Sequence, residues 1–351
     1  MKLFFPKLRR VVVPAALTAA FAFAFAACGT TGVGDRQAYL VEPVIIGEGG
    51  EWALDGLLTL PSQASAANPV PAVVLVHGSG PADMDSSLFG NRPFLDIASH
   101  LSANGVAVIR YDKRTYTHGV RMMEVFGGNL TVWEESVEDA ILAAELLRAD
   151  PRIDENRVYM LGLSLGGMLA PRIHASGGNF SGLILLAGTP RSLSDIILEQ
   201  FRTIVALTME AGPEKDIQLT QLDMLEELFA AVPGMTHSQA METQIMGGSS
   251  AYYFKDLAAR SFADYVREVT IPILAMQGGR DFQVRPDKDF VLLKELLEGR
   301  DNVTFKLYDD LNHLFMLTTA TNFVEHAEGI TQTPGRVDVR VLQDIVDWVL
   351  R

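Results

Sequence analysis

The sequence predicts an α/β protein whose central sheet is mostly parallel and is covered by helices on both faces. Apolar runs of strand length, such as AVVLV at residues 72–76 and GLILLA at residues 182–187, are continuous rather than alternating. Continuous runs of this kind are typical of strands that are buried on both faces. Between the runs lie segments with apolar residues at helical spacing. Strands that alternate with helices along the chain indicate parallel strands joined by helical crossovers.

The individual elements follow from local patterns. In residues 39–61, two runs with strand character, YLVEPVII and EWALDGLLTL, flank Gly49-Gly50, so a hairpin is expected. Short apolar runs predict strands at residues 72–76, 106–109, 157–163, 182–187, 271–276 and 303–307. Apolar residues that recur on one face predict helices at residues 91–104, 135–147, 165–175, about 288–297, and 339–350. We therefore interpret residues 39–351 as one α/β domain.

Residues 191–269 interrupt this alternation and are interpreted as a helical cap inserted between two strands. The segment has mainly helical spacing and carries Met209, Met224, Met235, Met241 and Met246. Methionine side chains suit an apolar pocket of variable shape, although packing between amphipathic helices also explains them. A loop predicted at residues 121–133 carries Met122, Met123 and Phe126, which are candidate residues of a pocket wall.

Residues 1–28 have the layout of a secretory signal, with a basic head followed by an apolar run and small residues. The run is short for a membrane span. The stretch Phe25-Ala26-Ala27-Cys28 resembles a bacterial lipoprotein cleavage box, with Phe25 where Leu is usual, and Cys28 would then be the lipidated first residue. Residues 29–38 read as a flexible tether. We therefore expect an exported protein tethered to a membrane on its extracytoplasmic side; an uncleaved anchor helix is the alternative.

Composition excludes several classes of chemistry and partner. Cys28 is the only cysteine, so the folded body has neither an intrachain disulfide nor a thiol nucleophile. The formal net charge of −14 argues against a nucleic-acid partner, because an acidic surface repels phosphates. The sequence also contains no glycine fingerprint for a nucleotide cofactor.

The segment GLSLG at residues 162–166 stands where the pattern changes from strand to helix. This is a G-x-S-x-G motif, and a serine on such a sharp turn is held above the sheet beside the N-terminus of the helix. Ser164 is therefore the candidate nucleophile, which needs a base and donors for the developing oxyanion. A tight junction with an idle serine is the alternative reading.

The remaining catalytic groups are expected later in the chain, in the order acid and then histidine. Asp281 follows the strand at residues 271–276, and His313 follows the strand at residues 303–307. Both groups should lie at the carboxyl edge of the sheet, where sites in such folds gather. The less favoured candidates are His326, which follows no strand, and Asp287 and Asp301, which flank a helix and suit capping or solvent exposure.

Two backbone N–H groups are expected to hold the oxyanion. One belongs to Leu165, the residue after the nucleophile, and the other belongs to Ser79 in the loop HGSG after an early strand. His77 in that loop is interpreted as structural. The charged run Asp112-Lys113-Arg114 is interpreted as an ion-pair network, with binding of a substrate carboxylate left open.

From about residue 40 to residue 351, the chain resembles the α/β-hydrolase superfamily. The motifs HGSG, GLSLGG, GGRD and NH occur in the order found in that family. The stretches LDGLLTLP, RYDKR and VLQDIVDW make it similar to secreted bacterial esterases. The resemblance implies an α/β-hydrolase fold with a helical cap and a carboxylic-ester hydrolase that uses neither a metal nor another cofactor. A serine at 164 argues against haloalkane dehalogenases, which use aspartate, and dienelactone hydrolases, which use cysteine.

The sequence thus predicts a serine hydrolase that cleaves small to medium acyl esters through an acyl-enzyme intermediate on a triad of Ser164, His313 and Asp281. The fold also serves serine peptidases and thioesterases, and both activities remain alternatives. A non-catalytic binding protein on the same fold is a third possibility. Such proteins usually lack a member of the triad, and none is missing from this sequence.

Overall fold

The computed structural model describes residues 38–246 and 248–351. The predicted signal, its Cys28 and residues 29–37 of the predicted tether lie outside the described residues. Within the described ranges, no helix has both the length and the apolar character that crossing a membrane requires.

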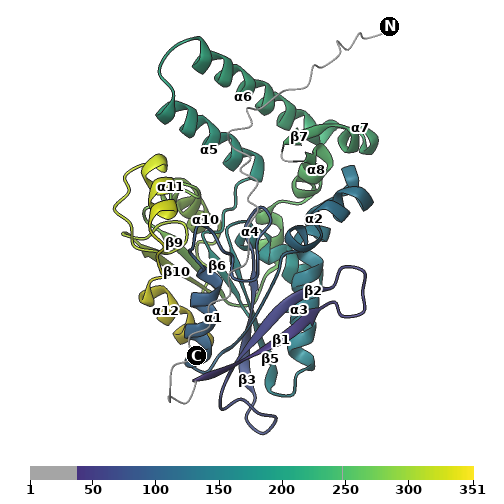
Figure 1. Cartoon of the computed structure of the whole chain (residues 1–351), viewed down its shortest axis with the longest axis vertical. Helices are drawn as coiled ribbons and strands as arrows, with labels where there is room; N and C mark the ends of the chain where they lie inside the picture. Colours follow the sequence, from purple (N-terminus) through teal and green to yellow (C-terminus); the bar gives the residue numbers. More distant parts are fainter. Residues whose placement is uncertain (1–37, 247) are drawn as a thin grey trace.

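The core of the molecule is an eight-stranded sheet with the strand order β1-β2-β4-β3-β5-β6-β9-β10 (Figure 1). Its strands are β1 (Tyr39–Ile46), β2 (Leu54–Pro61), β3 (Val70–Val76), β4 (Ala107–Tyr111), β5 (Ile153–Leu163), β6 (Leu183–Leu186), β9 (Ile273–Gly278) and β10 (Val303–Tyr308). The β1–β2 hairpin pairs antiparallel, and β2 pairs antiparallel with β4. All other pairs are parallel, which confirms the predicted fold class.

Helices cover both faces of this sheet. They are α1 (Pro93–Ala103) and α12 (Val339–Val349) on one face, and α3 (Glu138–Ala149) and α4 (Leu165–Ile173) on the other. Side chains of β3 alternate between these layers, as successive residues of a strand must. Ala72, Val74 and Val76 pack with α3 and α4, whereas Val73 and Leu75 pack with α1 and α12. Both faces of the central strands are therefore apolar, which explains the continuous runs in the sequence.

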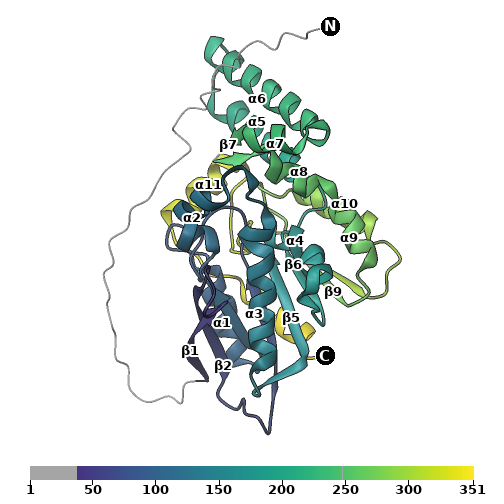
Figure 2. The same ribbon diagram turned by 90° about the vertical axis from the view of Figure 1, so that its right-hand side faces the viewer.

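Between β6 and β9 the chain leaves the sheet and forms mainly helices, most of which lie above one end of the sheet (Figure 2). These elements are α5 (Leu193–Thr208), α6 (Pro213–Ala231), α7 (His237–Glu242), β7 (Gln244–Met246), β8 (Ser249–Ser250), α8 (Ala251–Ala259) and α9 (Phe262–Glu268). We call residues 191–269 the cap region. Helices α5 and α6 project furthest from the sheet, as an antiparallel pair (Figure 1).

Three further helices connect or follow strands of the sheet, and the sequence predicts only the one near residues 288–297. They are α2 (Arg114–Val125), α10 (Val291–Leu296) and α11 (Phe323–Gln332). Single turns of 3₁₀ or π geometry occur at Gly127–Asn129, Trp133–Val137, His174–Gly178, Val232–Gly234 and Pro286–Phe290. The loop expected at residues 121–133 is thus wrong in its first part, because α2 continues to Val125. Only Arg114 and Met122 of α2 are buried, and its apolar residues Val120, Met123 and Val125 are exposed.

Candidate active site

Ser164 occupies the sharp turn between β5 and α4. Its backbone angles, φ 56° and ψ −116°, lie in a region that non-glycine residues seldom adopt and that costs about 1–3 kcal/mol. The N–H of Ser164 donates to the carbonyl of Leu186 on β6 at 2.8 Å, which ties the turn to the sheet. The surrounding structure thus holds the serine in a strained conformation at the end of a central strand.

The glycines around Ser164 allow strand and helix to pass at very short range. A Cβ atom at Gly162 would lie less than 3.0 Å from the carbonyl oxygen of Gly166, and one at Gly166 would lie equally close to the carbonyl oxygen of Val76. Both clashes are with backbone atoms, which cannot rotate away. The glycine-rich segment is therefore required by the packing of α4 on β3 and β5.

Asp281 and His313 lie side by side after β9 and β10. The Nδ1 of His313 is 2.7 Å from Oδ2 of Asp281. Because an ionised carboxylate can only accept, Nδ1 carries the proton and Nε2 is left as the basic nitrogen. The same carboxylate accepts from Nε2 of Gln277 at 3.0 Å and from the backbone N–H groups of Gln283 and Val284 at 2.8 and 3.0 Å. These donors fix the buried acid and the plane of the imidazole.

One cavity of about 650 Å³ brings most of the predicted site together. Ser164, His313, Ser79 and Leu165 all contribute to its wall. Asp281 lies behind His313, with its side chain fully buried. Across the described ranges, no hydrogen bond joins Oγ of Ser164 to His313. Hydrogen bonds of this kind are often long before a substrate binds and tighten in the complex.

The chain matches a family model described as the alpha/beta hydrolase family over residues 73–326. The chain belongs to this family. The match covers the sheet from β3 onwards, the cap region and both loops that carry Asp281 and His313.

Comparison with individual proteins agrees with the family. This alpha/beta hydrolase is 37% identical to Esterase EstD of Thermotoga maritima over 299 residues, which are 85% of this chain and 66% of the relative. The chain thus spans just under two thirds of that relative's length. Among solved structures, Est1E from Butyrivibrio proteoclasticus has a TM-score of 0.52 at 16% identity, covering 88% of this chain and 98% of that chain. The acylaminoacyl peptidase of Pyrococcus horikoshii has a TM-score of 0.50 at 16% identity, covering 79% and 38%. These two likenesses concern the fold.

The loop that follows β3 carries the first predicted oxyanion donor of this alpha/beta hydrolase. A Cβ atom built on Gly78 would lie 3.3 Å from Cβ of Ser164, so this loop runs directly against the serine. In the part of the chain that the structure describes, nothing accepts a hydrogen bond from the N–H of Ser79. The N–H of Leu165, as the first residue of α4, has no carbonyl one turn earlier in the helix. Both predicted donors are available at the cavity.

Two of the three candidate pocket residues line the cavity, and the third does not. Met122 on α2 and the neighbouring Met123 line the cavity. Phe126 is not part of its lining, and its ring packs against Trp52 with 5.3 Å between the centroids. The expectation that Phe126 forms a pocket wall is therefore not met, because this aromatic ring finds a partner beside the β1–β2 hairpin instead.

The alternative acids lie away from the imidazole of His313. The side chain of Asp287 is 61% exposed and pairs with Arg285, and Asp301 is exposed to solvent. His326, the alternative base, is buried on α11, and its Nε2 lies 3.2 Å from Nε2 of Gln283. Burial, and then the nearby imidazole of His313, lower the pKa of His326 to about 4.

His77 has the structural surroundings that the sequence analysis expects. Its Nε2 lies 2.9 Å from the carbonyl oxygen of Asp83, and its ring packs between Phe94 and Tyr111. Burial, followed by the nearby charge of Lys113, lowers the pKa of His77 to about 3. The imidazole is therefore neutral near pH 7 and braces the loop that carries Ser79.

A buried group that the sequence analysis does not assemble lies beside the same loop. Nζ of Lys113 donates to the carbonyl oxygens of Gly78 at 2.8 Å and Gly80 at 3.1 Å, and to Oε1 of Glu135 at 2.5 Å. The hydroxyl of Tyr253 on α8 donates to Oε2 of Glu135 at 2.5 Å. The sequence marks Lys113 as part of a charged run, but no motif links it to Glu135 or Tyr253.

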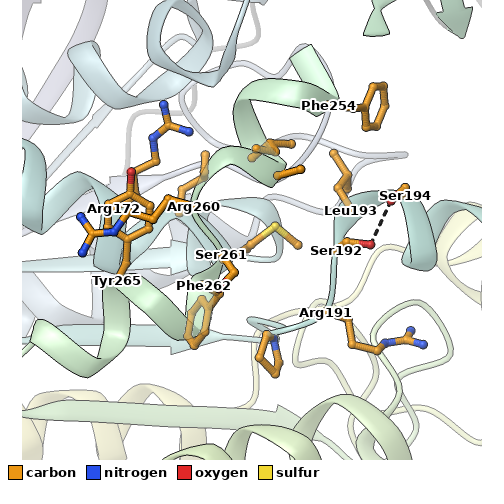
Figure 3. Close-up of a pocket in the computed structure, with 15 residues that line it drawn as sticks. Arg172, Arg191, Ser192, Leu193, Ser194, Phe254, Arg260, Ser261, Phe262 and Tyr265 are labelled. Carbon is orange, nitrogen blue, oxygen red and sulfur yellow. Dashed lines mark hydrogen bonds between the residues drawn. The ribbon is translucent and has the colours of Figure 1, made fainter. Parts of the chain in front are cut away.

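A second cavity, of about 130 Å³, shares Met168, Leu193 and Phe254 with the main one. Figure 3 shows the side chains of Arg172 and Arg260 on one side of it. Each of these arginines is already paired: Arg172 contacts Asp256, and Arg260 contacts Glu268. The pairs neutralise the charge around this small space, so its character is set by its apolar wall.

Proposed function

We propose that this alpha/beta hydrolase is a serine esterase that cleaves small to medium acyl esters with Ser164 as the nucleophile. The observation that carries the proposal is the arrangement at one cavity. A strained serine at a helix N-terminus and a histidine share its wall, and the histidine is held at 2.7 Å from a buried carboxylate. A nucleophile, a base and an orienting acid are the parts that acyl transfer requires.

In the first step, Oγ of Ser164 attacks the carbonyl carbon of the ester while Nε2 of His313 takes the hydroxyl proton. The carbonyl oxygen becomes an oxyanion, which accepts from the N–H groups of Ser79 and Leu165. Collapse of this intermediate breaks the carbon–oxygen bond of the ester. The departing alcohol receives the proton from His313 and leaves the acyl group on Ser164.

In the second step, a water molecule attacks the acyl carbon and gives one proton to His313. The resulting oxyanion uses the same two N–H groups, and its collapse returns the proton to Oγ of Ser164 and releases the carboxylic acid. Asp281 remains ionised throughout. It keeps the proton on Nδ1 of His313 and stabilises the imidazolium that forms in each step.

The substrate class rests on the cavity and on the relative. Met122, Met123, Leu193 and Ile196 give the cavity an apolar lining, and a volume of about 650 Å³ holds a small or medium acyl group. The relative that is 37% identical carries the name esterase. These two points favour esters over peptides as the substrates of this chain.

The test combines covalent labelling with a substrate panel. The full chain should react with a fluorophosphonate at Ser164 and hydrolyse p-nitrophenyl esters, and Ser164→Ala should remove both activities, with a loss of about 10⁶-fold in kcat. A panel of acyl esters, thioesters and aminoacyl amides should rank the acyl esters first. Faster turnover of amides would replace the esterase assignment with a peptidase. An unlabelled serine in a folded protein would contradict the serine hydrolase itself.

We also propose that the chain is exported and held at a membrane through a lipid on Cys28. The basic head, the apolar run and the small residues before Cys28 support this proposal. Expression of the full chain in bacteria with labelled palmitate should give a lipidated membrane form. Cys28→Ser should abolish the label; a Cys28→Ser protein that is still labelled would contradict it.

A further inference from the structure

We propose that Lys113, Glu135 and Tyr253 form a positioning device that holds the oxyanion loop in its active shape and makes it dependent on helix α8 of the cap region. We call these three residues the Lys113 cluster. The inference deepens the proposed function and rests on it, since it concerns the loop that carries the N–H of Ser79. It assigns to these residues an effect on the reaction without contact to the reacting atoms.

The contact with Lys113 fixes the orientation of one peptide group in the oxyanion loop. The bond between Gly78 and Ser79 is trans, so its C=O and its N–H point in opposite directions. The carbonyl oxygen of Gly78 accepts from Nζ of Lys113 at 2.8 Å. The N–H of Ser79 must therefore point away from Lys113. Because Ser79 lines the cavity beside Ser164, Lys113 determines where this donor is aimed.

The ammonium group of Lys113 is held in one place by its partners. Its side chain is only 2% exposed, and each of its three donor protons has a partner: Gly78, Gly80 and Glu135. A buried ammonium is tolerated only when it is paired, which Glu135 provides. A lysine that holds two carbonyls of one loop keeps that loop from turning over. In contrast, a solvated lysine would rotate freely among many partners.

Glu135 joins the loop to the cap region through its contacts with Lys113 and Tyr253. Glu135 lies in the π turn Trp133–Val137, and π turns are frequent at functional sites. Its second oxygen accepts from the hydroxyl of Tyr253 at 2.5 Å. Burial, and then the negative charge of Glu135, raise the pKa of Tyr253 well above its usual value, so the phenol stays a donor. Tyr253 is thus the only member of the Lys113 cluster that belongs to the cap region.

The same tyrosine meets the substrate cavity. Tyr253 and Glu135 both contribute to its wall, together with Ser79 and Ser164. A shift of α8 that breaks the bond from Tyr253 would free one side of Glu135 and loosen the hold of Lys113 on the loop. Closure of the cap region over a substrate and alignment of the oxyanion donor would then be one event.

The experiment removes the link to the cap region and leaves the buried ion pair intact. Lys113→Met would leave Glu135 buried without a partner and is expected to impair folding, so it is not the test. Tyr253→Phe deletes one hydroxyl and keeps the ring. The matched control is Tyr252→Phe, on the preceding residue of α8, whose ring contacts His237 and whose hydroxyl is outside the Lys113 cluster.

We expect Tyr253→Phe to lower kcat on p-nitrophenyl acetate by about 10-fold, which is less than the loss of a whole oxyanion donor, with KM unchanged. Tyr252→Phe should match the unmodified chain. A second readout is inhibition by an alkylboronic acid, whose tetrahedral adduct on Ser164 places an oxygen between the oxyanion donors. Its inhibition constant should rise by the same factor in Tyr253→Phe. A loss of packing alone would not weaken the binding of the tetrahedral adduct in proportion to kcat.

Each outcome has one reading, provided that thermal unfolding shows both variants to be folded at the assay temperature. If the unmodified chain neither hydrolyses the ester nor reacts with a fluorophosphonate, the proposed function fails. If it does both, and Tyr253→Phe has the kcat and the boronate inhibition of Tyr252→Phe, the Lys113 cluster is structural and the inference is overturned. A rise in KM at constant kcat would also overturn it, because the tyrosine would then only bind the substrate.

Discussion

The serine turn and helix α6 show how differently two parts of this alpha/beta hydrolase are built. At the serine turn, Gly162 and Gly166 meet backbone atoms at distances that leave no room for a Cβ, and nearly every side chain nearby is buried. Helix α6 has 19 residues, of which only Phe229 is buried. The loops of the sheet edge are held by buried polar groups, whereas α5 and α6 are joined partly by exposed ion pairs such as Arg202 with Asp223.

The difference shows where each part of the proposed activity is fixed. Groups that transfer protons must keep their geometry within small limits, and the sheet edge supplies this through close backbone packing. The cap region contributes Met246, Tyr253 and Phe254 to the cavity, so it shapes what the cavity admits. The exposed helix α6 can change shape without moving the loops that carry Ser164 and His313.

The largest expected effect comes from closing the space at the serine turn. Gly166→Ala places a Cβ against the carbonyl oxygen of Val76, so we expect a loss of more than about 4 kcal/mol in the free energy of unfolding, or no folded protein. Gly234→Ala in the cap region is the control. Its added Cβ would meet nothing within 4 Å, and stability should change by less than about 1 kcal/mol. Denaturant unfolding measures both, and equal stabilities would remove the contrast between the two regions.

The next effect concerns chemistry rather than folding. Asp281→Asn should leave the fold intact and lower kcat by about 10⁴-fold, because an amide no longer keeps the proton on Nδ1 of His313. Asp287→Asn, at an exposed acid outside this pair, should keep normal turnover. Steady-state kinetics on a p-nitrophenyl ester measure both. If the two variants were equally active, Asp281 could not be the acid of the triad.

A smaller effect should appear as the pH falls. His77 is neutral in the folded protein with a pKa of about 3, while its unfolded pKa is about 6.5, so below that value only the unfolded state takes up a proton. Its contribution to stability is complete above about pH 6.5 and is lost progressively as pH falls towards about 3. Between pH 7 and pH 5 we expect a loss of about 2 kcal/mol from His77 alone.

Urea unfolding at several pH values tests this loss. His77→Gln should lower the overall stability but flatten its dependence on pH. His237→Gln, on the exposed surface of α7, should keep the original slope. A His77→Gln protein with an unchanged slope would show that this imidazole is not the proton-excluding group.

The smallest effect is expected in the cap region. The guanidinium of Arg202 lies 2.8 Å from Asp223 and 2.6 Å from Glu226, and both acids are more than half exposed. Exposed pairs of this kind contribute little, so Arg202→Ala should change the free energy of unfolding by less than about 1 kcal/mol and leave turnover unaffected. Thermal unfolding at low and high salt measures it. A large, salt-independent loss would mean that α5 and α6 are more tightly coupled than their exposure indicates.

The candidate site could be predicted from sequence because each of its groups comes shortly after a strand of the parallel part of the sheet. The apolar runs at β5, β9 and β10 are local patterns, and parallel strands bring their carboxyl ends to one edge. Ser164 followed from its G-x-S-x-G motif, and Asp281 and His313 followed from their positions after strands. The structure places Ser164 and His313 at one cavity, with Asp281 behind His313. The hairpin and both helical layers were predicted for the same reason, since period and turn residues are short-range features.

The remainder depends on contacts that no local pattern records. Helix α2 was not predicted because its first residue, Arg114, is buried against Asp139, a partner 25 residues away. Phe126 was expected to line the cavity, but its ring packs against Trp52, which lies in the loop of a hairpin distant in sequence. Glu135 and Tyr253 are more than one hundred residues apart, and no sequence motif links them. Only the structure shows that Glu135 accepts from both Lys113 and Tyr253.

The close backbone contacts of Gly162 and Gly166 also limit which positions of this protein can be mutated. In a mutant library, random codons at Gly162 or Gly166 would yield mostly unfolded members, and screening effort spent there is wasted. Random codons in α6 would be tolerated far more widely, because Phe229 is the only buried residue of that helix. Directed evolution of this protein should therefore place its random codons at exposed positions such as those of α6 and leave the serine turn untouched.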